Sequence, residues 1–139
     1  MNAKLIEAIE EAEEFLKETK EIFVEDREKY LSNKEKIYAT SMTLFTTLNA
    51  LIEIGEEVIT IEKLKSAHSY QDIFIKLFEK NIISEESVIF LKASMKDRNM
   101  IAHQYGEFKR EKVYDLIKNS HKIEQFISEI KKYYKEKIK

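Results

Sequence analysis

The sequence contains no cysteine and no proline, and only two of its 139 residues are glycine. Without cysteine there is no disulfide framework, no cysteine-ligated zinc or iron–sulfur cluster, and no thiol nucleophile. Glycine and proline mark turns, so a chain with almost none of them does not fit a β-sandwich or a β-barrel. With 43% hydrophobic residues it is also unlike a disordered segment. The composition therefore predicts a protein that is nearly all helix.

Long apolar runs are also missing. No stretch approaches the roughly 18 apolar residues that a membrane-spanning helix needs, and the N-terminus becomes acidic within ten residues, unlike a secretory signal. The formal net charge is −2, from 24 basic and 26 acidic side chains, which argues against nucleic-acid binding through bulk positive charge. We expect a cytoplasmic protein with no membrane partner, folded as a single domain over residues 1–139.

Hydrophobic residues recur at helical spacing in the N-terminal half. One apolar face predicts a long first helix that ends near Ser32, because Ser32 and Glu35 have the spacing of a capping box for the next helix; this face contains Leu5, Ile9, Ala12, Leu16, Phe23 and Tyr30. The second helix carries Ile37, Ser41, Leu44, Leu48, Leu51, Gly55 and Ile59 on one stripe. A glycine within such a stripe indicates close approach of a neighbouring helix.

The C-terminal half predicts three further helices after a loop over residues 60–68. Ser69 and Asp72 resemble an N-cap for a short helix that ends near Asn81, with Ile73, Phe74, Leu77 and Phe78 facing inward. Ser84 begins the next helix, which buries Val88, Leu91 and Met95 and ends before Gly106. A last helix from about Lys109 repeats Leu116, Ser120, Ile123, Ile127, Ile130 and Tyr134. The fold class is therefore all-α, an antiparallel up-down bundle of four to five helices.

Charge is distributed unevenly along the chain. Residues 1–28 carry four basic and ten acidic side chains, a balance of −6, whereas residues 92–112 carry six basic and three acidic, a balance of +3. Such runs are usually solvated helix faces. The basic segment has a second notable property, because it also contains the chain's densest group of residues with catalytic chemistry.

Within eight residues at the end of a helix lie Arg98, Asn99, His103 and Tyr105. Histidine exchanges protons near neutral pH, arginine binds phosphate and its developing transition-state charge, and tyrosine binds phosphate or stacks on a base. RNA supplies its own nucleophile in the 2′-hydroxyl, so these groups suit metal-free cleavage of RNA. On one continuous helix, however, Arg98 and His103 lie about 140° apart and converge only if the helix ends early or two chains combine their copies.

Other interpretations of these residues remain open at this point. Arg98 would be purely structural if it were a partner of Asp97. His103 would be purely structural if it were only a histidine at the end of a helix. The three histidines, at 68, 103 and 121, lack metal-ligand spacing, and we expect His68 and His121 to be structural or surface residues. No serine-hydrolase elbow and no glycine-rich nucleotide loop is present.

Arg98, four intervening residues, His103, one residue and Tyr105 match the Arg-x4-His-x-Tyr signature of HEPN-domain ribonucleases, and Asn99 is the polar residue typical after that arginine. Over roughly residues 37–130 the chain resembles the HepT toxins of HEPN–nucleotidyltransferase toxin–antitoxin pairs. The resembling segments are TTLNALIEIGEEVI, SYQDIFIKLFEKNIIS, SMKDRNMIAHQYGEF and REKVYDLI.

The resemblance implies a homodimer in which two motifs face one cleft, forming an endoribonuclease that needs no metal and no cofactor. His103 would then be the acid/base and Arg98 the phosphate-binding cation, with Asn99 and Tyr105 in support. It also implies a partner, a minimal nucleotidyltransferase antitoxin that blocks the toxin by transferring AMP to Tyr105. The alternative hypothesis is a non-catalytic helical subunit that binds or regulates a nucleotidyltransferase.

Overall fold

The computed structural model describes residues 1–103 and 110–138, which form helices without any strand. In chain order these helices are α1 (Ala3–Ile22), α2 (Arg27–Leu31), α3 (Lys34–Ile61), α4 (Tyr70–Glu79), α5 (Glu85–His103), α6 (Arg110–Lys118) and α7 (His121–Ile138). The prediction of an all-α protein is confirmed.

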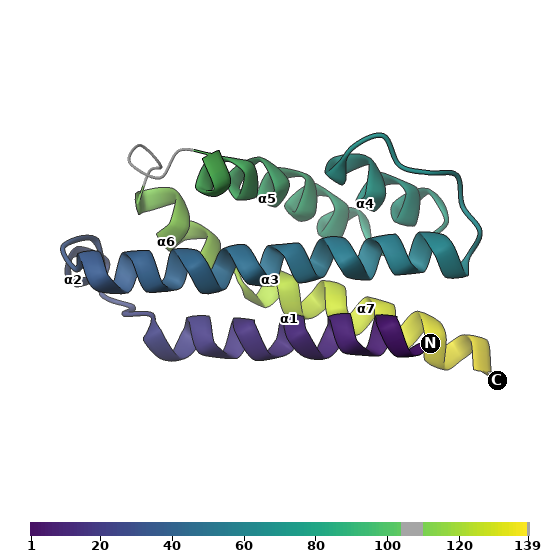
Figure 1. Cartoon of the computed structure of the whole chain (residues 1–139), viewed down its shortest axis with the longest axis horizontal. Helices are drawn as coiled ribbons and strands as arrows, with labels where there is room; N and C mark the ends of the chain where they lie inside the picture. Colours follow the sequence, from purple (N-terminus) through teal and green to yellow (C-terminus); the bar gives the residue numbers. More distant parts are fainter. Residues whose placement is uncertain (104–109, 139) are drawn as a thin grey trace.

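The long helix α3 is the axis of the molecule, and α1 runs antiparallel to it along most of its length (Figure 1). On the opposite side of α3 lie α4 and α5, while α6 and α7 lead back along the bundle to the end at which the chain begins. Successive long helices therefore run up and down, as the short connections predict. No helix in the described ranges is long and apolar enough to span a membrane.

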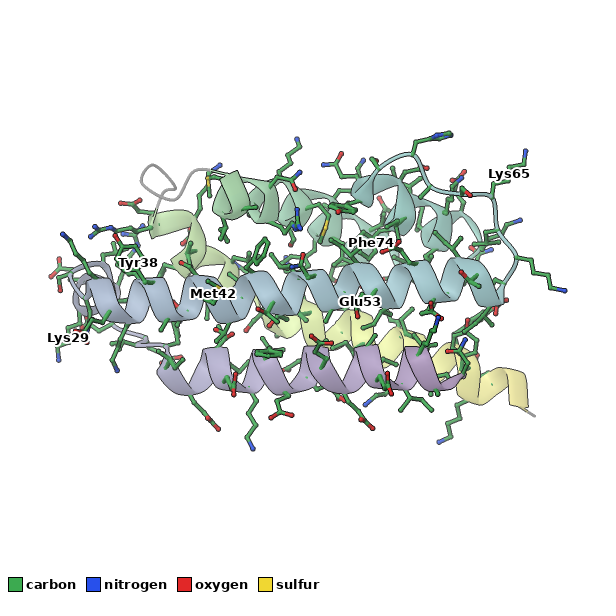
Figure 2. The ribbon with its side chains drawn as sticks, viewed as in Figure 1. Lys29, Tyr38, Met42, Glu53, Lys65 and Phe74 are labelled. Carbon is green, nitrogen blue, oxygen red and sulfur yellow. The ribbon has the colours of Figure 1, made fainter. Side chains whose placement is uncertain are left out.

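The apolar stripes predicted from helical spacing form the core. All seven stripe residues of α3 are buried, and so are the inward residues of α1. Phe74 of α4 is fully buried next to α3 (Figure 2) and meets Phe126 of α7 edge to face, with ring centroids 5.7 Å apart. Phe78 departs from the prediction, since 38% of its surface is exposed.

Gly55 marks the contact between α3 and α4. A Cβ atom added at Gly55 would collide with Cγ2 of Ile73 and would touch the ring of Phe74. Both Ile73 and Phe74 are buried, so the absence of a side chain at Gly55 allows α3 and α4 to approach closely. This confirms the predicted reason for a glycine within the stripe.

The predicted long first helix is wrong beyond Ile22. The backbone turns extended at Phe23, and Asp26 starts α2 by accepting a hydrogen bond from the amide of Lys29 at 3.0 Å. The break lets the Phe23 ring pack against Tyr30 and Tyr114 at centroid distances of 5.1 and 5.3 Å. The prediction of a capping box at Ser32 is also wrong, because a different residue caps α3.

At the start of α3 the capping residue is Asn33, whose side chain accepts from the amide of Lys36 at 3.1 Å. Ser32 instead ends α2. The predicted last helix is likewise two helices, because the chain makes a tight turn at Asn119 and Ser120. The Asn119 amide side chain donates to the carbonyl of Asp115 at 2.8 Å and so ends α6.

Candidate functional site

Three of the candidate residues, Arg98, Asn99 and His103, lie on α5, whose start was predicted correctly. The Ser84 hydroxyl accepts from the amide of Ser87 at 3.2 Å, and the Glu129 carboxylate of α7 accepts from the amide of Ser84 at 3.1 Å. Burial alone would raise the pKa of Glu129, but hydrogen bonds from Ser84, Ser87 and Gln125 outweigh it and lower that pKa. A charged carboxylate therefore holds the N-terminus of α5 in place.

Arg98 is half-buried near the other end of α5 and contacts both α3 and α4. Its Nε–H donates to Oδ1 of Asn49 at 2.9 Å, and one terminal nitrogen donates to Oδ1 of Asn99 at 3.1 Å. The guanidinium carbon lies 4.8 Å from the ring centre of Phe45 and 5.0 Å from that of Tyr70. Two amides and two aromatic rings thus fix the group's position.

None of these partners carries a negative charge. In the described part of the chain no carboxylate lies within 4 Å of the Arg98 guanidinium, so the structural interpretation that pairs it with Asp97 receives no support. Burial raises the pKa of Asp97, partly offset by the positive charge of Lys112. Among the described residues, no negative charge therefore pairs with the Arg98 guanidinium, a group whose donors suit an anion such as phosphate.

His103 is the last residue of α5, and the backbone is helical without interruption from Glu85 to His103. Five residues of continuous helix place the Arg98 and His103 backbone positions about 140° apart around α5, as the sequence spacing indicates. The His103 side chain, Tyr105 and Gly106 lie outside the described part of the structure, so their predicted roles stay predictions.

A groove of about 870 Å³ adjoins Arg98 between α3, the segment 62–69, α4 and α5. Asn99 and Tyr70, which both contact Arg98, form part of its wall. The remaining lining residues are Glu56, Ile59, Thr60, Ser66, Ala67, His68, Ser69, Gln71, Ile73, Met95 and Lys96. Arg98 therefore lies beside a concave surface of mixed polar and apolar character.

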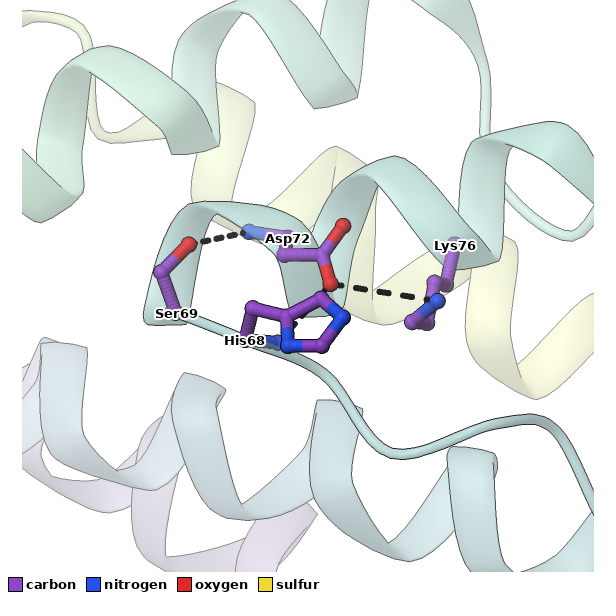
Figure 3. A network of polar contacts seen from close by, with 4 residues as sticks. All are labelled: His68, Ser69, Asp72 and Lys76. Atoms are coloured by element: carbon purple, nitrogen blue, oxygen red, sulfur yellow. Dashed lines mark hydrogen bonds and ion pairs between the residues drawn. The ribbon is translucent and has the colours of Figure 1, made fainter.

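Polar contacts fix the rim of this groove where α4 begins (Figure 3). The Ser69 hydroxyl accepts from the amide of Asp72 at 3.0 Å, which confirms the predicted cap. The Asp72 carboxylate in turn accepts from the amide of His68 at 2.9 Å and lies 3.8 Å from the Lys76 ammonium. The backbone of His68, whose exposed side chain lines the groove, is thereby held in place.

Three residues of the site were not identified from the sequence: Phe45, Asn49 and Tyr70. Asn49 is the one amide in the uncharged stretch from 37 to 52, and a half-buried amide in such a helix is a signal that a partner is needed. The two aromatic residues carry no comparable signal, because aromatic residues at helical spacing are ordinarily core.

The remaining histidines fit the predicted surface roles. His121 is exposed at the first position of α7, and His68 is exposed at the groove. Within residues 1–103 and 110–138, no three histidine, aspartate or glutamate side chains are grouped to hold a metal ion.

Comparison with known proteins adds independent information. Residues 5–132 match the model of the family described as "Ribonuclease HepT-like". No curated protein sequence matches the chain.

Two solved structures share the fold. One is a tri-AMPylated Shewanella oneidensis HEPN toxin in complex with an MNT antitoxin, with a TM-score of 0.86, 23% sequence identity, and coverage of 94% of this chain and 98% of that one. The other is a toxin–antitoxin structure with AMP-PNP, with a TM-score of 0.84, 22% identity, and coverage of 94% and 99%. The likeness shows that this chain has the helical fold of these proteins.

Proposed function

Because the chain belongs to the HepT-like ribonuclease family, we propose that it is the toxin of a toxin–antitoxin pair and acts as a metal-independent endoribonuclease. The observation that carries this proposal is Arg98, a guanidinium held by amides and rings with no carboxylate within 4 Å among the described residues. An arginine that served only as a surface ion pair would face a carboxylate. This one offers its charge to an anion beside a groove.

In the proposed reaction, the 2′-hydroxyl of RNA attacks the adjacent phosphorus while a base removes its proton. The P–O5′ bond breaks, and an acid protonates the leaving 5′-oxygen, which leaves a 2′,3′-cyclic phosphate and a 5′-hydroxyl. Arg98, supported by Asn99, binds the phosphate and stabilises the extra negative charge of the transition state. His103 is the acid/base.

Base and acid are needed on opposite sides of the phosphorus, and one chain provides one His103. We propose that residues 1–139 form a single HEPN domain that dimerises, so that two copies of the motif face one cleft. The two-fold arrangement supplies one histidine as base and the other as acid. It also removes the difficulty that the Arg98 and His103 backbone positions lie about 140° apart around one α5.

Purified, unmodified protein should cleave RNA in the presence of EDTA, and the His103→Ala variant should lose at least about 100-fold of that activity, as is typical for loss of a general acid/base. Gel analysis of end-labelled RNA measures this. The matched control is His121→Ala, which removes an exposed histidine of α7 and should leave the rate within twofold. Native protein that cleaves no RNA over a broad set of sequences would instead favour a non-catalytic subunit of a nucleotidyltransferase.

We further propose that the partner is a minimal nucleotidyltransferase antitoxin that transfers AMP to Tyr105. The bound AMP would place bulk and negative charge beside the motif and exclude RNA. RNA and this partner are both expected in the cytoplasm.

Incubation with the partner, ATP and magnesium should therefore raise the mass of the chain by one or more AMP units. The Tyr105→Phe variant should show no increase, whereas Tyr38→Phe, which alters an exposed tyrosine of α3, should be modified normally. Mass spectrometry of the intact chain measures both. AMP found on the Tyr105→Phe variant would refute the assignment of this tyrosine.

A further inference from the structure

The groove beside Arg98 has a volume of about 870 Å³ and is lined by residues from Asn99 to Glu56, so it is larger than one phosphate group needs. We propose that it is an RNA subsite, which binds the nucleotide next to the scissile phosphate of a single-stranded substrate. This inference rests on the proposed ribonuclease activity, and it adds to that activity a second place where the substrate is held.

The first argument is continuity along α5. The groove wall on this helix consists of Met95, Lys96 and Asn99, and the next residue at helical spacing is His103, four positions beyond Asn99. The line of the groove along α5 thus leads toward the backbone position of His103. Arg98 touches the same wall through its hydrogen bond to Asn99. An RNA strand whose phosphate binds at Arg98 therefore passes directly into the groove.

The second argument is chemical. The exposed Lys96 ammonium and the His68 imidazole face the groove, and both can donate hydrogen bonds to phosphate oxygens. Ile59 and Ala67 add apolar surface, and the Tyr70 ring adds an aromatic edge or face. Recognition of single-stranded RNA combines cationic contacts to the backbone with apolar or aromatic contacts to an unstacked base.

Charge orients the bound nucleotide. Glu56, the carboxylate in the groove wall, lies on α3 seven residues beyond Asn49, or about 10 Å along the helix axis. A phosphate is repelled there and is attracted to Lys96 and Asn99 at the Arg98 end. The base then occupies the part of the groove bounded by Ile59, Ala67 and Tyr70.

The walls are fixed rather than assembled on binding. Gln71 of α4 donates to the carbonyl oxygen of Lys92 on α5 at 3.0 Å, and the Ser69–Asp72–His68 contacts hold the segment before α4 against its first turn (Figure 3). The volume of about 870 Å³ falls within the range of about 300–1,000 Å³ typical of ligand sites. Little ordering is needed before a nucleotide binds.

The test measures RNA binding in the His103→Ala background, so that it does not depend on cleavage. Fluorescence anisotropy is recorded with a labelled single-stranded RNA over a range of salt concentrations. Adding Lys96→Ala should weaken binding about tenfold, as expected for loss of a charged hydrogen bond. It should also reduce the salt slope of log K by about 0.7, the value for one phosphate contact on a single strand.

The matched control is Lys92→Ala, which removes an exposed lysine one turn earlier on the same helix and outside the groove. It should change the affinity by less than twofold. Equal affinity and equal salt slope for the Lys96→Ala and Lys92→Ala proteins would overturn the subsite. So would cross-links from a 5-iodouridine RNA that occur only on peptides lacking groove residues, since iodouridine in the groove should react with Tyr70 or His68.

Substrate length gives a second measurement with the active protein. Removing the nucleotides on one side of the cleavage site should raise KM about tenfold in the native protein and leave KM of Lys96→Ala unchanged, because both changes remove the same contact. Cleavage that is independent of both Lys96 and substrate length would leave the ribonuclease intact and reject the subsite. RNA binding that depends on Lys96 in a protein that never cleaves RNA would support the subsite and reject the ribonuclease.

Discussion

At the scale of single residues, the groups that fix the position of the Arg98 guanidinium are not groups that neutralise its charge. Two amide oxygens and two rings hold the guanidinium, and none of them neutralises it. A carboxylate in the place of Asn49 would hold the Arg98 Nε–H more strongly. It would also compete with phosphate for the positive charge of the guanidinium.

The Asn49→Asp variant tests whether the Arg98 charge must stay unneutralised by its partner at position 49. It keeps the shape of the side chain and the hydrogen-bond acceptor, and it adds a negative charge. We expect a fall in kcat/KM for RNA of at least about tenfold, as one charge-assisted contact to phosphate weakens, with no loss of thermal stability. Steady-state kinetics and thermal unfolding measure the two effects. Asn33→Asp is the matched control, since aspartate and asparagine cap a helix equally well. An Asn49→Asp protein with native kcat/KM would show that the charge of Arg98 is not used.

Prediction from the sequence grouped candidate residues that are close in the chain and did not identify those that the fold brings in. Arg98 and Asn99 are neighbours, and their hydrogen bond is consistent with the motif. Phe45, Asn49 and Tyr70 reach Arg98 from other helices, and nothing in a single sequence states which helix faces which. The tertiary contacts decided that part of the site.

At the scale of the helices, inward positions were predicted more accurately than helix ends. The apolar spacing continues in phase across the breaks at Phe23 and at Asn119. The sequence therefore predicts one helix in place of α1 and α2, and one helix in place of α6 and α7. The breaks depend on capping side chains, namely Asp26, Asn33 and Asn119, and such polar residues are also common on solvated helix faces. Hydrophobic periodicity alone does not distinguish a polar residue that caps a helix from one on a solvated helix face.

Gly55 provides a test at this scale. Gly55→Ala should gain about 1 kcal/mol of helix propensity and lose about 1–3 kcal/mol through overpacking against Ile73, so we expect a net loss of about 1 kcal/mol. Urea unfolding measures it. In an Ile73→Ala background the collision disappears, and the same glycine substitution should become stabilising. A destabilising effect of equal size in both backgrounds would contradict close packing as the reason for the glycine.

At the scale of the whole molecule, the uninterrupted α5 helix bears on the proposed dimer. Five residues of continuous helix place the Arg98 and His103 backbone positions about 140° apart around the helix axis, so a site that uses both side chains favours two copies of the chain. The sequence spacing already raised this difficulty, and the observed helix keeps it.

A single inactive chain should therefore inactivate the dimer that it joins. Mixed dimers of a native and a His103→Ala chain, isolated through two different affinity tags, contain one histidine where the proposed mechanism uses a base and an acid, and we expect them to cleave RNA at least about 100-fold more slowly than native dimers. The control pairs a native chain with a His121→Ala chain, and this mixed dimer should keep the native rate. A native/His103→Ala dimer with half the native rate or more, or a monomer in sedimentation equilibrium, would contradict the composite site.

The two rings over Arg98 have one further consequence, which concerns spectroscopy. The chain has only three arginines; Arg27 lies over one ring, that of Tyr114, and Arg98 lies over two. Ring currents should shift the Nε–H resonance of Arg98 away from the other two. A single resolved NMR signal would then report occupancy of the proposed phosphate site during titration with RNA, without any label attached to the protein's surface.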